Sequence, residues 1–152
     1  MSPVSVAVAP SGYFAYVANL GSDNVSSYTI NPNTGLLAPV GSPIATGKSP
    51  RSLAVEPSGH FAYVANSGSD TVSVYTINAG TGLLTPIGLP IATGQIPFSV
   101  AVEPLGHFAY VANISSDNVS AYTINATTGA LKPIAGSPFK AGSNPVSIVM
   151  AK

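Results

Sequence analysis

The sequence predicts an all-β protein made of β-propeller blades, three per chain, each blade being a four-stranded antiparallel sheet. One observation is a repeat: the tetrapeptide Tyr16–Asn19 recurs as Tyr63–Asn66 and as Tyr110–Asn113, with a spacing of 47 residues each time. A second observation is that each copy holds four short apolar runs bounded by Gly, Pro, Asn and Asp. A third is that no 3.6-residue apolar stripe long enough for a helix occurs between those punctuating residues. Repeats of this length with four strands each are typical of propellers.

The middle copy shows the expected order of elements. Its strand-like runs are residues 52–56, 60–66, 72–78 and 83–92. The fourth run carries Pro86 and Pro90, and proline cannot donate to a sheet ladder, so this strand should form the outer edge of the blade. Small Ala and Val side chains on both faces of the inner runs favour close packing between neighbouring blades.

The chain divides into four segments, all expected to belong to one propeller unit. The blades are predicted at 3–49, 50–96 and 97–144. The first two copies agree at 33 of 47 positions. The remaining residues, 145–152, repeat the start of a blade: Pro145–Lys152 closely matches Pro3–Pro10. We therefore expect an extra innermost strand after the third blade.

Three blades cannot close a ring, because closed propellers have about four to eight. The partner expected is a second copy of the chain, so that a homodimer makes six blades; a nine-bladed trimer is the alternative. One copy of the duplicated first strand should then occupy the innermost slot at each junction as a clasp. The segment 145–152 is the expected occupant, because its linker makes the normal connection from one blade to the next.

The composition excludes several classes of function. Charged residues make up 7% of the chain, and its formal net charge is zero, so nucleic acid and anionic membrane surfaces are not expected partners. With no cysteine, the chain has no disulfide and no thiolate chemistry. No signal peptide or membrane-spanning segment is recognised, which fits either synthesis without an export signal or a mature or excised chain. The start of a repeat at residue 3 favours the second view.

The positions that begin the innermost strands are the first candidate site. They are Val4, Arg51 and Phe98, near the mouth of the expected channel, and Arg51 is the only arginine. Its guanidinium could hold a carboxylate or phosphate group of a small ligand with two parallel hydrogen bonds. The alternative is that Arg51 pairs with a nearby aspartate or is solvated.

Asp23, Asp70 and Asp117 recur once per blade on the same face of the ring, which we call the top face and define by the 66–70 turn and the 94–97 loop. Calcium needs six to eight oxygen ligands, which no Asp-x-Asp cluster supplies. An Asx-type turn, in which the carboxylate accepts backbone N–H groups, is the favoured interpretation. These aspartates are kept as candidates for ligand contact.

His60 and His107 lie on the bottom face, which we define by the turns 57–60 and 78–82. Neither has a ligand residue at metal-binding spacing, so exposed turn histidines are expected, with no metal and no cofactor. Glu56 and Glu103 end the first strands nearby, and the surrounding Pro and Gly residues predict hydrated carboxylates with ordinary pKa values. No residue is predicted to be catalytic.

The repeat resembles the YVTN-type β-propeller family, which includes lactonase-like seven-bladed propellers. The matching elements are the Tyr-Val-Ala-Asn tetrapeptides, the preceding Pro-Ser-Gly turns (104–106 is Pro-Leu-Gly) and the Asp-x-Val-Ser-x-Tyr-Thr-Ile-Asn segments at 23–31, 70–78 and 117–125. The resemblance covers essentially the whole chain. It implies the propeller fold and allows an exported parent protein. It also implies a possible activity, since some relatives hydrolyse or form lactones with Arg, His and Glu groups around the channel.

Three functions are consistent with the sequence. A non-catalytic scaffold or binding module is favoured, because Arg51 lies on the top face while the His and Glu residues lie on the bottom face. The second is a lactonase-like hydrolase with its site at the channel mouth, which follows only from the resemblance. The third is an inactive fragment of a larger propeller.

Overall fold

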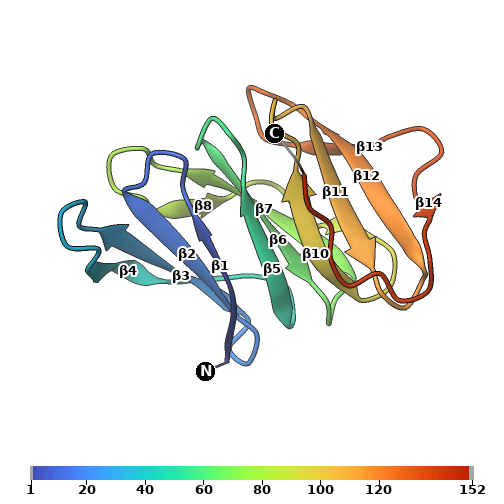
Figure 1. The fold of residues 1–152 in the computed structure, drawn as a ribbon, viewed down its shortest axis with the longest axis horizontal. Coiled ribbons are helices and arrows are strands. Elements are labelled where there is room, and N and C mark those ends of the chain that lie inside the picture. The colour runs from blue at the N-terminus through green and yellow to red at the C-terminus, as the bar shows by residue number, and fades with distance from the viewer. Residues whose placement is uncertain (1, 151–152) are drawn as a thin grey trace.

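A computed structural model describes residues 2–150 and consists of three antiparallel sheets lying side by side (Figure 1). The first sheet contains β1 (Pro3–Val8), β2 (Phe14–Asn19), β3 (Asn24–Ile30) and β4 (Leu37–Ala45). The second contains β5 (Pro50–Val55), β6 (Phe61–Asn66), β7 (Thr71–Ile77), β8 (Leu84–Pro86) and β9 (Ile91–Ala92). The third contains β10 (Pro97–Val102), β11 (Phe108–Asn113), β12 (Asn118–Ile124), β13 (Leu131–Pro133) and β14 (Phe139–Lys140). The predicted all-β fold, with one blade-like sheet per repeat, is confirmed.

Strand order in each sheet follows the chain, as in a propeller blade. The Pro-bearing fourth run is the outer edge, as predicted, but in the second and third sheets it is split into two short strands. In the second sheet β8 and β9 both pair with β7. Between them, Ile87 still donates its N–H to the carbonyl oxygen of Val74 at 2.8 Å, and residues 88–90 leave the ladder. Pro90 lies in that gap, where no backbone N–H is needed. In the first sheet β4 stays continuous and accommodates the same irregularity as a bulge opposite Val25–Ser27.

Asparagine side chains fix the turns at both ends of the blades. On the bottom face, Asn78 Oδ1 accepts the N–H groups of Gly80 and Thr81 at 3.0 Å each, an Asx turn repeated at Asn31 and Asn125. On the top face, the buried Nδ2 of Asn66 donates to Ser73 Oγ at 2.9 Å. The last residue of the Tyr-Val-Ala-Asn tetrapeptide thus holds the start of the third strand.

The core lies between the sheets. One apolar cluster joins the first and second sheets and a second joins the second and third; the first includes Phe14, Tyr16, Leu53, Tyr75 and Leu84. Polar bonds cross the same junctions. Tyr75 Oη donates to the carbonyl oxygen of Ala45 at 2.8 Å, and Ser5 Oγ accepts the N–H of Leu53 at 3.2 Å. Because the apolar side chains of each sheet pack against the neighbouring sheet, each blade depends on its neighbour to bury these side chains.

The C-terminal segment, red in Figure 1, runs beside β10 without forming a strand in the single chain. Its Ile148 N–H donates to Ser99 Oγ at 3.2 Å, the same bond that links the innermost strands of neighbouring blades. Residues 145–150 therefore lie where the innermost strand of a fourth blade would begin. The predicted extra strand extends to 152, and its residues 151–152 fall outside the described part of the chain.

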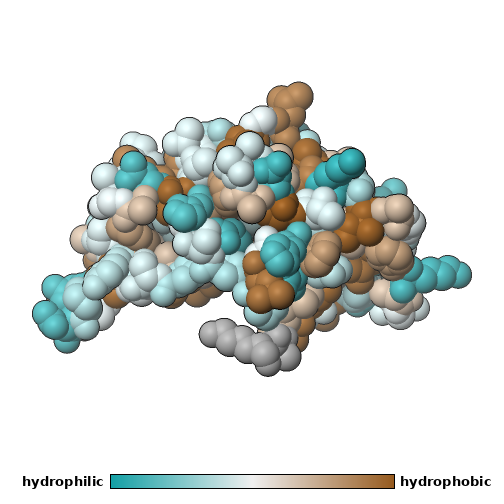
Figure 2. All heavy atoms as spheres, turned by 90° about the horizontal axis from the view of Figure 1, so that it is seen from above, coloured by the Kyte–Doolittle hydropathy of each residue, from teal (hydrophilic) through white to brown (hydrophobic). Residues whose placement is uncertain are grey.

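In Figure 2 apolar and polar side chains are interspersed over the face in view. Within residues 2–150, there is no helix with the length and apolar character needed to cross a membrane.

Candidate functional site

The three positions predicted at the channel mouth share one backbone irregularity. In each innermost strand the register skips a residue, between Pro3 and Ser5, between Pro50 and Ser52, and between Pro97 and Ser99. The skipped residues are Val4, Arg51 and Phe98. A bulge leaves its extra residue outside the ladder and redirects the side chain, so the repeat presents one free side chain per blade at this point.

Two of these side chains contact each other. The guanidinium carbon of Arg51 lies 4.6 Å from the centre of the Phe98 ring, in cation–π geometry. Arg51 makes no ion pair among residues 2–150, where the one pair within 4.0 Å joins His107 and Glu103. Arg51 Nε is buried and, within the same residues, has no hydrogen-bond partner. The alternative pairing of Arg51 with a top-face aspartate is therefore absent from the described part of the chain. The stacking of Arg51 on Phe98 was not predicted from the sequence.

The top-face aspartates hold the loops that connect the blades. Asp70 has a positive φ of 53°, and its Oδ1 accepts the N–H of Ile96, 26 residues later, at 2.8 Å. Asp23 and Asp117 make the same bond to Ser49 and Asn144. The carboxylates thus accept backbone N–H groups, as expected for a structural role, but from the loop leading to the next blade instead of from the local turn. All three aspartates are exposed.

The bottom face carries a buried cluster around Glu56, contrary to the prediction from the sequence. Glu56 was expected to be hydrated with an ordinary pKa, yet it is 5% exposed. Its Oε1 accepts the hydroxyl of Ser58 and, at 2.8 Å, the N–H of His60, while its Oε2 accepts the N–H of Ser58 at 2.7 Å. Ser58 Oγ also lies 2.7 Å from His60 Nδ1. The Pro57-Ser58-Gly59 turn folds the chain back over Glu56, and Gly106 of the next blade covers it from the other side.

Hydrogen bonding outweighs burial at Glu56. Burial alone would raise its pKa, but the bonds from the Ser58 hydroxyl and from the N–H groups of Ser58, His60 and Phe61 hold the pKa below its ordinary value. The sequence signal for this cluster was the residue at position 58. Leucine occupies the equivalent position 105 and alanine occupies the position equivalent to Glu56 in the first copy, so only the middle copy combines Glu, Ser and His.

Glu103 and His107 form a more open version of the same turn. Their Oε1 and Nδ1 atoms lie 3.9 Å apart. The pKa of Glu103 is lowered, chiefly by the N–H of Leu105. His60 and His107 both line a hollow of about 270 Å³ between the second and third blades. Among residues 2–150, no three His, Asp or Glu side chains lie close enough to hold a metal ion.

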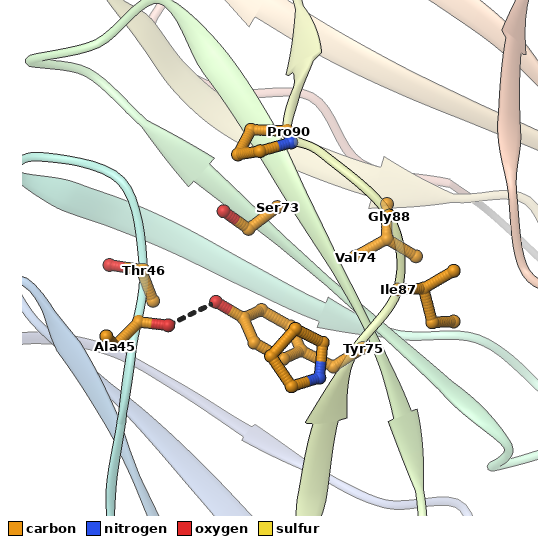
Figure 3. A pocket seen from close by; sticks show the side chains of 9 residues that line it. Ala45, Thr46, Ser73, Val74, Tyr75, Ile87, Gly88 and Pro90 are labelled. Atoms are coloured by element: carbon orange, nitrogen blue, oxygen red, sulfur yellow. Dashed lines mark hydrogen bonds between the residues drawn. The ribbon is translucent and has the colours of Figure 1, made fainter.

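Ser58 and His60 also line a second hollow, of about 90 Å³, together with Ser11 and Phe14 of the first blade. A hollow of about 620 Å³ lies beside the Pro10, Pro57 and Pro104 turns together with Val102 and Met150, and these lining side chains are apolar. Figure 3 shows a smaller hollow of about 130 Å³ at the junction of the first two blades. There the Tyr75 hydroxyl points across to the Ala45 carbonyl oxygen (Figure 3), so this hollow belongs to the packing between blades.

Replacing Glu56 with glutamine should lower the free energy of unfolding at pH 7 by about 1–3 kcal/mol, because buried N–H groups lose a charged acceptor. Since the pKa of Glu56 is lowered in the folded state, its contribution is present above the unfolded pKa and is lost as the pH falls through the folded pKa. Urea unfolding at pH 7 and pH 3 should therefore show a smaller loss on acidification for the variant than for the wild type. Glu103→Gln is the control and should have a smaller effect at pH 7. Equal pH dependence in wild type and Glu56→Gln would contradict the assignment.

The sequence also matches a family model, described as lactonase, seven-bladed β-propeller, over residues 2–96 and 87–150. The chain belongs to this lactonase propeller family. The resemblance stated from the repeat motifs is thereby confirmed. No curated protein matches the sequence significantly.

Solved structures share the fold of this lactonase-family chain at low identity. A Lactobacillus plantarum protein is 26% identical, with a TM-score of 0.86 over 95% of this chain and 43% of its own. A Bacteroides fragilis protein, provisionally named a 6-phosphogluconolactonase, is 23% identical, with a TM-score of 0.87 over 95% of this chain and 40% of its own. The periplasmic gluconolactonase of Pseudomonas aeruginosa is 23% identical, with a TM-score of 0.82 over 93% of this chain and 40% of its own. The chain thus spans less than half the length of these proteins.

Proposed function

We propose that the chain is a non-catalytic propeller scaffold whose channel mouth, at Val4, Arg51 and Phe98, contacts an anionic group of its ligand. The observation that carries the proposal is the separation of the charged groups. Arg51 is the second residue of β5, and Glu56 follows the end of that strand. Five residues of extended strand place them about 16 Å apart at roughly 3.3 Å per residue. A lactone carbonyl held by Arg51 would be out of reach of Glu56 and His60.

The bottom-face groups are also poorly suited to catalysis. A general base works best with a pKa near the operating pH, whereas Glu56 has a lowered pKa and its oxygens are occupied by hydrogen bonds. The Ser58 hydroxyl donates to Glu56, and the order of the three side chains is Glu–Ser–His. In hydrolytic triads the histidine lies between the serine and the carboxylate. The cluster is best explained as the support of a turn.

The channel mouth is suited to binding. Stacking on Phe98 fixes the plane of the Arg51 guanidinium, and no carboxylate of residues 2–150 neutralises it. A fixed guanidinium fork matches the geometry of a carboxylate or phosphate. Asp23, Asp70 and Asp117 each hold a loop around this face through Oδ1, and all three residues are exposed to a ligand donor.

Arg51→Ala should weaken the binding of 6-phosphogluconate by about 10- to 150-fold, the loss expected for hydrogen bonds to a charged group. Titration followed by NMR chemical shifts measures the effect. Lys48→Ala is the matched control, because Lys48 is an exposed cation on the loop that leads to Arg51. Equal loss in the two variants, or none in Arg51→Ala, would show that the channel mouth is not the binding surface.

The second candidate function, a lactonase, is favoured by the names of the Bacteroides fragilis and Pseudomonas aeruginosa proteins. Incubation of the chain with 6-phosphogluconolactone and with gluconolactone separates the two candidates. The scaffold proposal expects hydrolysis at the rate of buffer alone. Turnover above that rate which disappears in Arg51→Ala would replace the scaffold with a channel-mouth hydrolase. Absence of both turnover and binding would favour the inactive piece of a larger propeller.

A further inference from the structure

The two internal junctions between blades are built from the same set of residues. On the side that meets the preceding blade, three positions are buried in both the second and third blades: Leu53, Tyr75 and Leu84, and correspondingly Val100, Tyr122 and Leu131. On the side that meets the following blade, a phenylalanine and a tyrosine are buried: Phe14 and Tyr16, and correspondingly Phe61 and Tyr63. A junction is therefore a pair of complementary half-faces.

The two ends of the chain carry one half-face each. In the first blade, the residues equivalent to Leu53 and Leu84 are Val6 and Leu37, which are 65% and 54% exposed. In the third blade, the residue equivalent to Phe61 is Phe108, which is 37% exposed, compared with 6% for Phe61. The exposed positions are those that the internal junctions bury. The first and third blades therefore each carry one half of a further junction, and the two halves lie at opposite ends of the chain.

The contact between a glycine and an aromatic ring of the preceding blade is formed at both internal junctions, whereas at the chain ends its two partners are apart. A Cβ at Gly82 would overlap the ring of Phe14, and a Cβ at Gly129 would overlap the ring of Phe61, so each glycine is required by an aromatic ring of the preceding blade. The equivalent glycine of the first blade, Gly35, has the same positive φ of 72° and no atom within 4 Å of its Cβ position. Its missing partner is a ring at the position of Phe108.

The polar contacts follow the same rule. Tyr75 Oη donates to the Ala45 carbonyl oxygen at 2.8 Å and Tyr122 Oη donates to the Ala92 carbonyl oxygen at 2.7 Å. The equivalent donor in the first blade is Tyr28, and the equivalent acceptor in the third blade is the carbonyl oxygen of Lys140. Both halves of this bond are on the chain but at its opposite ends.

We infer that the occupant of each end face is a second copy of this chain, bound head to tail. The Phe108 face of one protomer meets the Gly35 and Leu37 face of the other, twice, so that two chains close a ring of six blades. The argument is continuity: each new junction repeats the contacts of two junctions already formed within the chain. Three copies would make nine blades, beyond the usual range of about four to eight.

The C-terminal segment determines how the innermost slot is filled. Ile148 already occupies the position on Ser99 that Leu53 and Val100 occupy on Ser5 and Ser52. The partner's first strand cannot take the same place. Residues 145–150 therefore become the innermost strand of the partner's first blade and pair with its β2, while the partner's own β1 is displaced. Val146 and Ile148 then take the positions of the partner's Val4 at the channel mouth and of the partner's Val6 in the junction. Each chain thus supplies one strand to the other.

The mass of the chain in solution, from light scattering coupled to size exclusion, tests the inference. The expected mass is that of two chains, and a wild-type monomer or trimer would overturn it. Gly35→Asn should leave the fold intact, because asparagine tolerates the left-handed backbone, and should weaken the dimer by about 100-fold or more through overlap with the Phe108 ring. The matched control is Gly88→Asn, at a φ of 58° and in open space, which should remain dimeric. A dimer that is equally stable in both variants would overturn the proposed face.

Two shortened chains test the strand exchange. A chain ending at residue 144 should lose most of its dimer, whereas a chain lacking residues 2–8 should keep it. Each must retain the circular-dichroism signal of the sheets. The opposite order, or equal behaviour of the two folded chains, would contradict the exchange.

Discussion

Replacing Gly82 with alanine should lower the free energy of unfolding by about 2–5 kcal/mol. The backbone at Gly82 has a φ of 73°, and a left-handed conformation costs an alanine about 1–2 kcal/mol. The new methyl group would also overlap the ring of Phe14, which is buried between the first and second blades. Forcing an extra carbon into a packed core typically costs a further 1–3 kcal/mol. Urea unfolding followed by circular dichroism measures the sum.

The chain contains a control that separates the two contributions. Gly88 lies in the same blade at a φ of 58°, but its Cβ position has no atom within 4 Å. Gly88→Ala should therefore show only the backbone cost, about 1–2 kcal/mol. If both variants lost the same stability, the ring of Phe14 would not be what requires glycine at position 82.

The sequence repeat was sufficient to predict the blades, because the same pattern of strands and turns occurs three times along the chain. The Tyr-Val-Ala-Asn tetrapeptides give the second strands as β2, β6 and β11, and the prolines at 86 and 90 place the fourth run at the sheet edge. The split of that run into β8 and β9 was not predicted. A proline shows that a backbone donor is missing, but it does not show how far the chain then departs from the ladder.

The site was predicted less well because its chemistry depends on contacts across the repeat. Glu56 is followed by Pro and Gly, which suggested an open turn, yet that turn and Gly106 of the next blade cover it. Arg51 and Phe98 are 47 residues apart and stack because both occupy bulges of adjacent innermost strands. The repeat alignment placed them at the same position of neighbouring blades, but a bulge is a property of the pairing and is not visible in one strand.

Leu37, Leu84 and Leu131 occupy equivalent positions of the three blades. Their truncation should have different effects on stability, because their neighbours in the structure differ. Leu84→Ala and Leu131→Ala should each lower the free energy of unfolding by about 2–5 kcal/mol, because both side chains are less than 10% exposed within the internal junctions. Leu37→Ala should cost less than about 1 kcal/mol in the single chain, since 54% of Leu37 is exposed there. Urea unfolding at the lowest protein concentration that circular dichroism allows measures the three values.

Raising the protein concentration should then change the result for only one of the three leucines. If two chains close the ring, Leu37 becomes buried against the third blade of the partner, and its truncation weakens assembly. The difference between wild type and Leu37→Ala should therefore grow with concentration, because dimer formation stabilises only the wild-type fold. The cost of Leu84→Ala should stay constant, because its junction lies within one chain. A Leu37→Ala cost that is independent of concentration would mean that the first blade's outer face stays uncovered, and a cost at Leu37 equal to that at Leu84 at every concentration would contradict the exposure itself.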